Sequence, residues 1–234
     1  MRFFIFVFAF TIACCNAAFS QKKAPIATAA PTLSGQPVQQ TDKEAQEILK
    51  GVSAKYKSYK SVKATFIVTI ENPDDKSKDV QKGTIYLKGN KYKVNVAGQD
   101  VISDGKTVWT YVKDGNEVQI NNVKNDENSI TPSNIFTIYE KGFLFKFAGD
   151  QTTNGMVYQL VELVPVDPKK KNFFKIKLTI NKNDKFITAA KVFNKNGSIH
   201  TIALDKFTPD VMTEDSIFTF SAASYPGAEV IDLR

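Results

Sequence analysis

The side chains that most often carry out chemistry in proteins are scarce in this chain of 234 residues. It contains one histidine, His200, and two adjacent cysteines, Cys14 and Cys15. A single imidazole and two neighbouring thiols leave almost nothing for a Cys–His nucleophile pair, a zinc site or a disulfide framework. We therefore expect no catalytic residues, no metal site and no cofactor.

The other polar residues support the same expectation. His200 lies in an alternating segment, 198–202, that is typical of a strand, so we interpret it as a structural residue. The acidic pairs Asp74-Asp75 and Asp126-Glu127 lie in loops without an evident partner. No nucleophile elbow, metalloprotease, P-loop or dinucleotide motif is present. This is the objection to the alternative that the protein hydrolyses lipids.

The first twenty residues are typical of an export signal. Arg2 precedes an apolar run, residues 3–13, that is too short for a membrane span of about 20 residues but fits a signal peptide. Small residues at Ala18 and Ser20 predict cleavage near Ser20. Residues 21–40, rich in Ala, Pro, Thr and Gln, are expected to form a flexible leader. The domain proper is then expected over 41–234, in a protein exported across the inner membrane.

One alternative concerns Cys14. The segment Thr11-Ile12-Ala13-Cys14 loosely resembles the site at which bacterial lipoproteins are acylated, although Thr11 stands where a branched aliphatic residue is usual. If Cys14 were acylated and retained, the protein would be tethered to a membrane instead of diffusing freely. The mass of the mature N-terminus distinguishes the two.

The formal net charge of +7 raises the question of an anionic partner. The lysines are scattered through alternating segments, where a solvated sheet face is the simplest explanation, so we expect no nucleic-acid binding. The run Lys169-Lys170-Lys171 follows a proline and is interpreted as a solvated turn. Contact of this run with a docking partner or a membrane surface is the alternative.

The sequence predicts one clear helix, over residues 42–58. Thr41 and Glu44 have the spacing of a capping box, which satisfies free N–H groups at a helix start. Apolar residues then follow at helical spacing and form one stripe, which is expected to pack on a sheet. The stripe consists of Ala45, Ile48, Leu49, Val52 and Tyr56.

From Val62 onward the hydrophobic period changes to two, which indicates strands separated by turn residues. Strands are predicted, among others, at 62–71, 83–88, 91–96, 107–112, 156–166, 173–180, 186–193, 198–204 and 217–220. Roughly ten or eleven consecutive strands are too many for a small flat sheet. We expect a mainly β fold: a strongly curved antiparallel sheet, an open or half β-barrel, covered by a few α-helices.

Segment 132–142 is a second candidate cover for this sheet. Thr131 precedes it as a possible N-cap, and Pro132 at its first position is typical of a helix start. The segment is unusually apolar for its length and ends at Gly142, which could act as a hinge. Two interpretations stay open: the segment plugs the core, or it is a movable lid over a cavity for acyl chains. A lipid is favoured energetically, because each buried methylene contributes about 0.8 kcal/mol.

Four stretches of the sequence resemble the LolA family of periplasmic outer-membrane lipoprotein carriers, in its Bacteroidetes-like version. The most specific is Ser-Asp-Gly-Lys-Thr-Val-Trp-Thr-Tyr at 103–111. The others are 61–66, which follows the capped helix, 83–88, and the ending, which comprises Phe218-Thr219-Phe220 with 225–232. Together the resemblance covers nearly all of 41–234.

The resemblance implies a monomeric, non-enzymatic periplasmic chaperone. It would bind the acyl chains of lipoproteins, receive them from an inner-membrane transporter and carry them to the outer membrane, where an acceptor could take them. Segment 132–142 would correspond to part of a lid, and Tyr92 to an aromatic residue near the cavity mouth. This chain lacks the arginine that the better-studied carriers have directly after the position of Lys88; Gly89 stands there, so the lid must be held differently.

The residues expected to line the cavity and the lid are apolar or aromatic positions on predicted strands and on segment 132–142. They are Phe66, Val68, Ile85, Leu87, Tyr92, Val94, Trp109, Ile135, Phe136, Ile138, Phe143 and Phe145. A membrane-tethered lipoprotein receptor or envelope-stress sensor on the same fold is the main alternative function. A small membrane β-barrel is a further alternative. The objection to it is that the outward face of such a barrel must be apolar, whereas the alternate faces of these strands carry Lys, Thr and Asn.

Overall fold

The computed structural model describes residues 42–123, 132 and 137–234, and everything below concerns these residues. They belong to the second of the two units into which the chain divides, Val38–Arg234. The expected signal peptide and leader lie outside the described residues. No helix within the described ranges is long and apolar enough to cross a membrane.

The described chain is mainly β, with one α-helix, α1 (Lys43–Ser58), ahead of the strands. The strands are β1 (Val62–Asn72), β2 (Ser77–Lys88), β3 (Lys91–Val96), β4 (Gln99–Ser103), β5 (Thr107–Val112), β6 (Glu117–Asn122), β7 (Phe143–Thr153), β8 (Met156–Pro165), β9 (Phe173–Asn181), β10 (Phe186–Asn194), β11 (Ile199–Pro209) and β12 (Glu229–Asp232). Four short 3₁₀ helices are η1 (Ile138–Glu140), η2 (Pro168–Lys170), η3 (Asp215–Phe218) and η4 (Ala222–Ser224).

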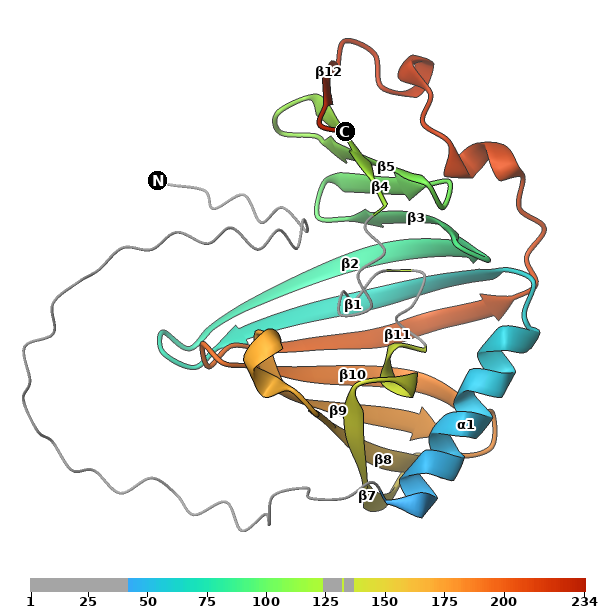
Figure 1. The fold of residues 1–234 in the computed structure, drawn as a ribbon, viewed down its shortest axis with the longest axis vertical. Helices are drawn as coiled ribbons and strands as arrows, with labels where there is room; N and C mark the ends of the chain where they lie inside the picture. Colours follow the sequence, from blue (N-terminus) through green and yellow to red (C-terminus); the bar gives the residue numbers. More distant parts are fainter. Residues whose placement is uncertain (1–41, 124–131, 133–136) are drawn as a thin grey trace, which may run out of the picture. The chain divides into compact units, whose positions relative to one another are not determined.

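All twelve strands form one sheet in the order β12-β6-β5-β4-β3-β2-β1-β11-β10-β9-β8-β7 (Figure 1). Consecutive strands pair as antiparallel hairpins within β1–β6 and within β7–β11. The two sets are joined by the antiparallel pairing of β1 with β11, and the short β12 joins β6 in parallel. The edge strands β12 and β7 are not paired with each other, so the sheet stays open. This confirms the expected fold class.

Several strands contain a β-bulge, which bends a sheet and increases its twist. The pairing of β1 with β11 shifts between Thr65 and Phe66, and β7 shifts against β8 between Phe147 and Gly149. The pairing of β10 with β9 shifts twice. These bulges lie in the long strands of the half-sheet next to α1, and they give those strands the curvature that the number of strands predicts.

Helix α1 begins one residue later than its capping box predicts. The N-cap is Asp42, whose Oδ1 accepts a 2.8 Å hydrogen bond from the N–H of Glu44. Asp42 also joins the helix to the edge of the sheet, since its N–H donates to the carbonyl of Phe145 and its Oδ2 accepts from the N–H of Phe147. A carboxylate can serve both partners at once because it has two oxygen acceptors.

The predicted apolar stripe of α1 is confirmed. Ala45 and Val52 are fully buried, and Leu49 and Tyr56 are nearly so. The helix contacts β7 and β10 and lies across the ends of the strands in this half of the sheet (Figure 1). Helix and sheet therefore form one layered core, as the spacing of the stripe indicates.

Near the C-terminus, the predictions fail in two places. Residues 217–220 are not a strand: η3 occupies Asp215–Phe218 and packs on β3 and β4, with Phe218 fully buried. The last strand, β12, lies at Glu229–Asp232 instead, where no strand was predicted. A short apolar alternation does not distinguish a strand from a segment that buries its alternate residues against a sheet face.

Candidate functional site

Most buried apolar side chains of the strands lie on one face of the sheet, here called the inner face, and the opposite face is called the outer face. The strand register defines the inner face, because directly paired residues point to the same side. Ala64 pairs with Ile85 and Phe207, and Ile85 pairs with Val94. Of the expected site residues, this face carries Phe66, Val68, Ile85, Leu87, Tyr92, Val94, Phe143 and Phe145.

The inner face is divided into two clusters. The first, between α1 and strands β7–β10, contains Phe143 and Phe145 together with the buried stripe of the helix. The second lies on β1–β3 and consists of Val62, Ala64, Ile85, Leu87, Tyr92 and Val94, with Phe66 packed against it. We call it the β1–β3 cluster. Because α1 contacts β7 and β10, it covers the first cluster.

Four aromatic rings connect the two clusters. Phe207 of β11 stacks on Phe186 with 5.5 Å between ring centroids, and it also contacts Tyr56 and Tyr59 at the end of α1. Tyr59 and Phe207 pack against both clusters. Sequence reasoning missed Phe207, because Leu204 and Phe207 are three residues apart and simple alternation places them on opposite faces. The bulge at Asp205 returns both to the inner face.

A hollow of about 530 Å³ opens beside these rings. Tyr59, Phe186 and Phe207 line it, and Lys55 and Lys185 lie among its polar residues. Its volume falls within the range of ligand pockets, roughly 300–1,000 Å³. Asp184 also lines it, so the hollow combines aromatic rings with charged groups of both signs.

The short helix η1 is fixed to α1 by two contacts. The Ser53 hydroxyl donates a 3.0 Å hydrogen bond to the hydroxyl of Tyr139, and Lys57 forms a 2.6 Å ion pair with Glu140. Burial raises the pKa of Tyr139 to about 12, although the hydrogen bond from Ser53 acts in the opposite sense. The hydrogen bond from Lys57 lowers the pKa of Glu140. The C-terminal part of segment 132–142 is therefore attached to the helix.

Three expected lid residues cannot be placed by their side chains. Ile135 and Phe136 lie outside the described residues. Ile138 begins η1, and only its backbone is described. Their role as lid residues stays a prediction.

Trp109 does not join the other expected site residues. In the pairing of β4 with β5 it stands opposite Ile102, whereas Ser103, the partner of Tyr92, pairs with Val108. Trp109 therefore lies on the outer face, and the inner-face position belongs to Val108, which packs against the β1–β3 cluster. Alternation within β5 alone could not decide this, because both of its faces carry apolar residues.

The most specific stretch of the family resemblance forms a turn. Ser103 Oγ accepts from the N–H of Gly105, and Asp104 Oδ1 accepts from the N–H groups of Lys106 and Thr107. Gly105 has φ of +92°, a conformation that favours glycine. The turn also fixes Ser103 opposite Tyr92 at the edge of the inner face. Burial raises the pKa of the Tyr92 hydroxyl, and the hydrogen bond with Ser103 offsets only part of this rise.

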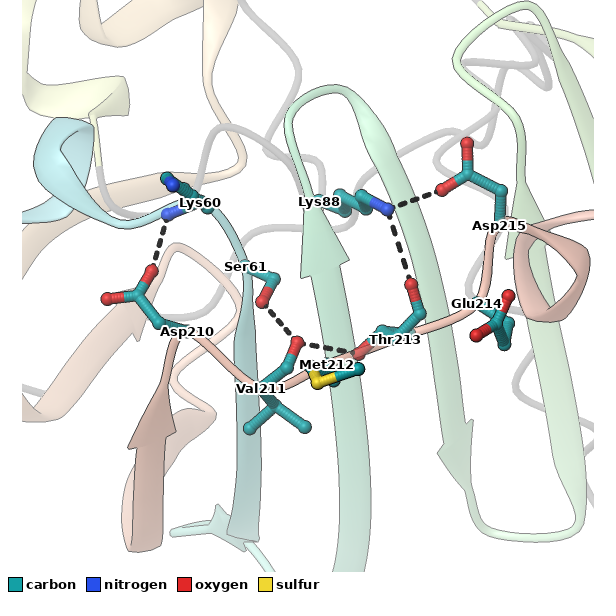
Figure 2. Close-up of a pocket in the computed structure, with 9 residues that line it drawn as sticks. All are labelled: Lys60, Ser61, Lys88, Asp210, Val211, Met212, Thr213, Glu214 and Asp215. Carbon is teal, nitrogen blue, oxygen red and sulfur yellow. Dashed lines mark hydrogen bonds and ion pairs between the residues drawn. The ribbon is translucent and has the colours of Figure 1, made fainter.

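A second hollow, of about 490 Å³, lies where the chain leaves β11 and crosses the ends of β1 and β2 (Figure 2). Its polar groups bind one another. Lys88 Nζ donates to the carbonyl of Thr213 and pairs with Asp215 at 2.6 Å, and Lys91 pairs with the other oxygen of Asp215 at 2.7 Å. These hydrogen bonds lower the pKa of Asp215 to about 2. This hollow is thus a junction that attaches the C-terminal segment to β2 and β3.

His200 is the single imidazole of the inner face. It pairs with Ile70 on β1 and with Val192 on β10, and burial lowers its pKa. Its Nε2 lies 3.4 Å from the hydroxyl of Ser198. Its interpretation as a structural residue stays a prediction.

Comparison with known proteins identifies the fold. The family model described as "Outer membrane lipoprotein carrier protein LolA" matches residues 57–221. No curated protein matches the chain. An uncharacterised conserved protein from Thermus thermophilus is similar in structure, with a TM-score of 0.55, 14% identity, and coverage of 81% of this chain and 99% of that one.

Two further solved structures show weaker similarity. A LolA superfamily protein from Nitrosomonas europaea has a TM-score of 0.42 and 14% identity, with 75% of this chain and 97% of that chain covered. The lipoprotein LppX from Mycobacterium tuberculosis has a TM-score of 0.47 and 10% identity, with 74% and 100% covered. The family match extends over more than half of the chain and fits the single open sheet described above, so the chain belongs to the LolA family, whose members are binding or carrier proteins.

Proposed function

We propose that this protein is a periplasmic carrier that binds the acyl chains of lipoproteins against the inner face of its sheet and moves them from the inner to the outer membrane. The cargo is an acylated lipoprotein, received from a releasing transporter in the inner membrane and passed to an acceptor in the outer membrane. The protein acts as a chaperone for the acyl chains, without a catalytic step or a cofactor.

One observation carries this proposal: within the described residues, a single open sheet collects most of its buried apolar residues on one face, in two adjoining clusters, the first of them under helix α1. The second, the β1–β3 cluster, is apolar from Val62 to Val94 and is itself buried. Acyl chains would therefore reach it by displacing side chains such as Tyr59 and Phe207 that pack on it. Acyl chains laid along it would gain about 0.8 kcal/mol for each methylene removed from water. Such binding needs no polar recognition of the cargo.

The hollow beside Tyr59 and Phe207 provides a route to this surface. Both residues pack against both clusters, so a chain that enters at the hollow meets the β1–β3 cluster next. Lys55, Asp184 and Lys185 line the hollow, so a polar end of the cargo would lie at this charged rim. Displacement of the aromatic rings, which pack by edge and stacking contacts, would open the route.

The proposal is tested by titrating the purified protein with a fluorescent peptide that carries a diacylglyceryl-cysteine at its N-terminus. Val96 packs at the margin of the β1–β3 cluster and is only partly buried, so a polar substitution there is tolerated better than in the centre. Val96→Glu places a carboxylate against the acyl chains, which disfavours binding strongly. We expect saturable binding by the parent protein and a loss of about tenfold or more, or 1.4 kcal/mol, in the variant.

Thr84→Glu is the matched control, because Thr84 lies on the outer face, next to inner-face Gly83 that pairs with Val96. It introduces the same charge on the opposite side of the sheet. Val96→Gln serves if Val96→Glu does not fold, as judged by circular dichroism. Equal affinities of the Val96 and Thr84 variants, or no binding by the parent protein, would contradict the proposal. Acylated peptide or lipid that co-purifies in native mass spectrometry would support it.

A further inference from the structure

The loop between β8 and β9 combines exposed apolar groups with a high density of lysines. Val166 is 61% exposed and Phe174 is 48% exposed, and these two exposed apolar residues flank the same loop. Between them lie three consecutive lysines, Lys169, Lys170 and Lys171, two of them in η2. The only acidic residue of this loop in the sequence is Asp167, which pairs with Lys170 at 3.3 Å.

The neighbouring turn between β10 and β11 extends this surface. The N–H of Lys195 donates to the carbonyl of Asn172, and its Nζ donates to the carbonyl of Pro168 at 2.6 Å, so the two loops lie side by side. Figure 1 shows η2 (orange) next to this turn. We define the η2 surface as Val166, Lys169, Lys170, Lys171, Phe174 and Lys195.

The outer face next to the η2 surface is also basic and aromatic. Phe174 contacts Phe193, and Lys175 and Lys191 lie over the Phe193 ring at 4.7 and 5.8 Å from its centroid. Lys191 stands directly opposite Lys177 in the pairing of β10 with β9. On the other side of Lys177 stands Glu162 of β8, which pairs with Lys175 at 3.4 Å, so one carboxylate serves several lysines and this part of the outer face keeps a net positive charge.

We propose that the η2 surface docks the protein on an anionic lipid bilayer. Exposed Phe and Val side chains enter the interfacial region, and lysines around them meet anionic headgroups while their aliphatic stems lie along the apolar region. Each lysine near such a surface contributes about 1 kcal/mol, or roughly a fivefold increase in affinity. An acidic protein would complement the lysines but would not account for the exposed Val166 and Phe174. An anionic bilayer accounts for both, because it offers negative headgroups and an apolar interior.

Docking at this place has a consequence for the segment before β7. The N–H of Val166 donates a 3.0 Å hydrogen bond to the carbonyl of Gly142, and Phe173, next to Phe174, stacks on Phe143 in the core. The η2 surface is therefore directly connected to the end of segment 132–142, which η1 attaches to α1. A bilayer bound there lies next to Gly142, whereas α1 lies toward the opposite ends of these strands (Figure 1).

The inference goes beyond the proposed function, since a protein can dock on a bilayer without carrying acyl chains, and its test is independent. The full chain and its variants, all confirmed by intact mass to have the same N-terminus, are floated with vesicles of phosphatidylglycerol and phosphatidylcholine in equal parts, and with vesicles of phosphatidylcholine alone. We expect binding to the anionic vesicles that weakens with salt. K169Q/K170Q/K171Q should lower this affinity by at least tenfold, given the contribution of each lysine of about fivefold.

K43Q/K106Q/K113Q is the control, because it removes the same three positive charges at places outside the η2 surface. Lys43 is the first residue of α1, and Lys106 and Lys113 flank β5. V166S/F174S should reduce binding that persists at high salt, whereas V80S/M212S, at two other exposed apolar residues, should not. Equal binding by the η2 and control variants, or no binding by the parent protein, overturns the inference. Binding of the acylated peptide would remain in that case, so this failure is distinguishable from failure of the carrier function.

Discussion

The ring of Phe66 lies over the α-carbon of Gly83, its direct partner across β1 and β2. A Cβ added at Gly83 would come within 2.4 Å of Phe66 Cζ and 2.8 Å of the backbone carbonyl of Asn95. Glycine is therefore required at this position by space, because an aromatic ring of the inner face occupies the volume of a side chain. This pair fixes the margin of the β1–β3 cluster, where acyl chains are proposed to bind.

Gly83→Ala is expected to destabilise the protein by about 1–3 kcal/mol, since overpacking forces the ring or the strand to move. Denaturant unfolding measures this. The double variant Gly83→Ala/Phe66→Leu should recover part of the loss. Gly51→Ala should instead stabilise the protein by about 0.5–1 kcal/mol, because a glycine within a helix is unfavourable. Gly51 lies within α1, and the added Cβ would meet Lys185 Cδ at 3.5 Å, an ordinary contact distance. Equal effects of the two substitutions would refute the packing argument.

Asp42 links the start of α1 to the edge strand β7 through both carboxylate oxygens. Asp42→Ala should cost about 1–2 kcal/mol, because the N–H groups of Glu44 and Phe147 lose their acceptor. Asp42→Asn keeps one acceptor oxygen and should cost less. Lys43→Ala, at the next position, is the control for helix propensity. A loss in Lys43→Ala as large as in Asp42→Ala would argue against the capping role.

The buried hydrogen bond from Ser53 to Tyr139 attaches η1 to α1. Tyr139→Phe and Ser53→Ala should each destabilise by about 0.5–1.5 kcal/mol. The double variant should cost less than the two single effects together, since the partners share one interaction. Thermal unfolding of the four proteins gives the coupling energy, and strictly additive effects would show that the bond contributes nothing.

The ion pairs of Asp215 with Lys88 and Lys91 should make the C-terminal segment sensitive to acid. The pKa of Asp215 is lowered from 3.8 to about 2, so the attachment is fully present above about pH 4 and is lost as the pH falls through about 2. The protection of the backbone amides of residues 215–218 against hydrogen exchange, relative to the unfolded chain at the same pH, should fall over this range. Both ion pairs are largely exposed, so salt should weaken them.

Asp215→Asn should give the same faster exchange at neutral pH and remove the acid dependence. Glu214→Gln, at the neighbouring carboxylate that takes no part in these two ion pairs, should leave both unchanged. Acid-dependent exchange that persists in Asp215→Asn would assign the effect to another group.

The sequence by itself determined α1, most of the strands and, where no bulge intervenes, which residues of a strand share a face. Alternation in β1, β2 and β3 placed Phe66, Ile85 and Val94 together correctly, because a side-chain period of two follows from the backbone of a strand alone. The stripe of α1 was predictable for the same reason, at helical period. Local patterns of this kind depend only on backbone geometry and on burial of apolar groups.

Only the tertiary structure decided which strands meet and which face each turns inward. The pairing of β1 with β11 joins residues far apart in the sequence, and the bulge at Asp205 places Phe207 on the inner face. Trp109 lies on the outer face because β5 pairs with β4 in a register that alternation cannot specify. Phe218 is buried by η3 and not by a strand, because a segment crossing a sheet face gains the same apolar burial without ladder hydrogen bonds. Pairing and register are long-range choices, so they are set by the packing of the whole sheet.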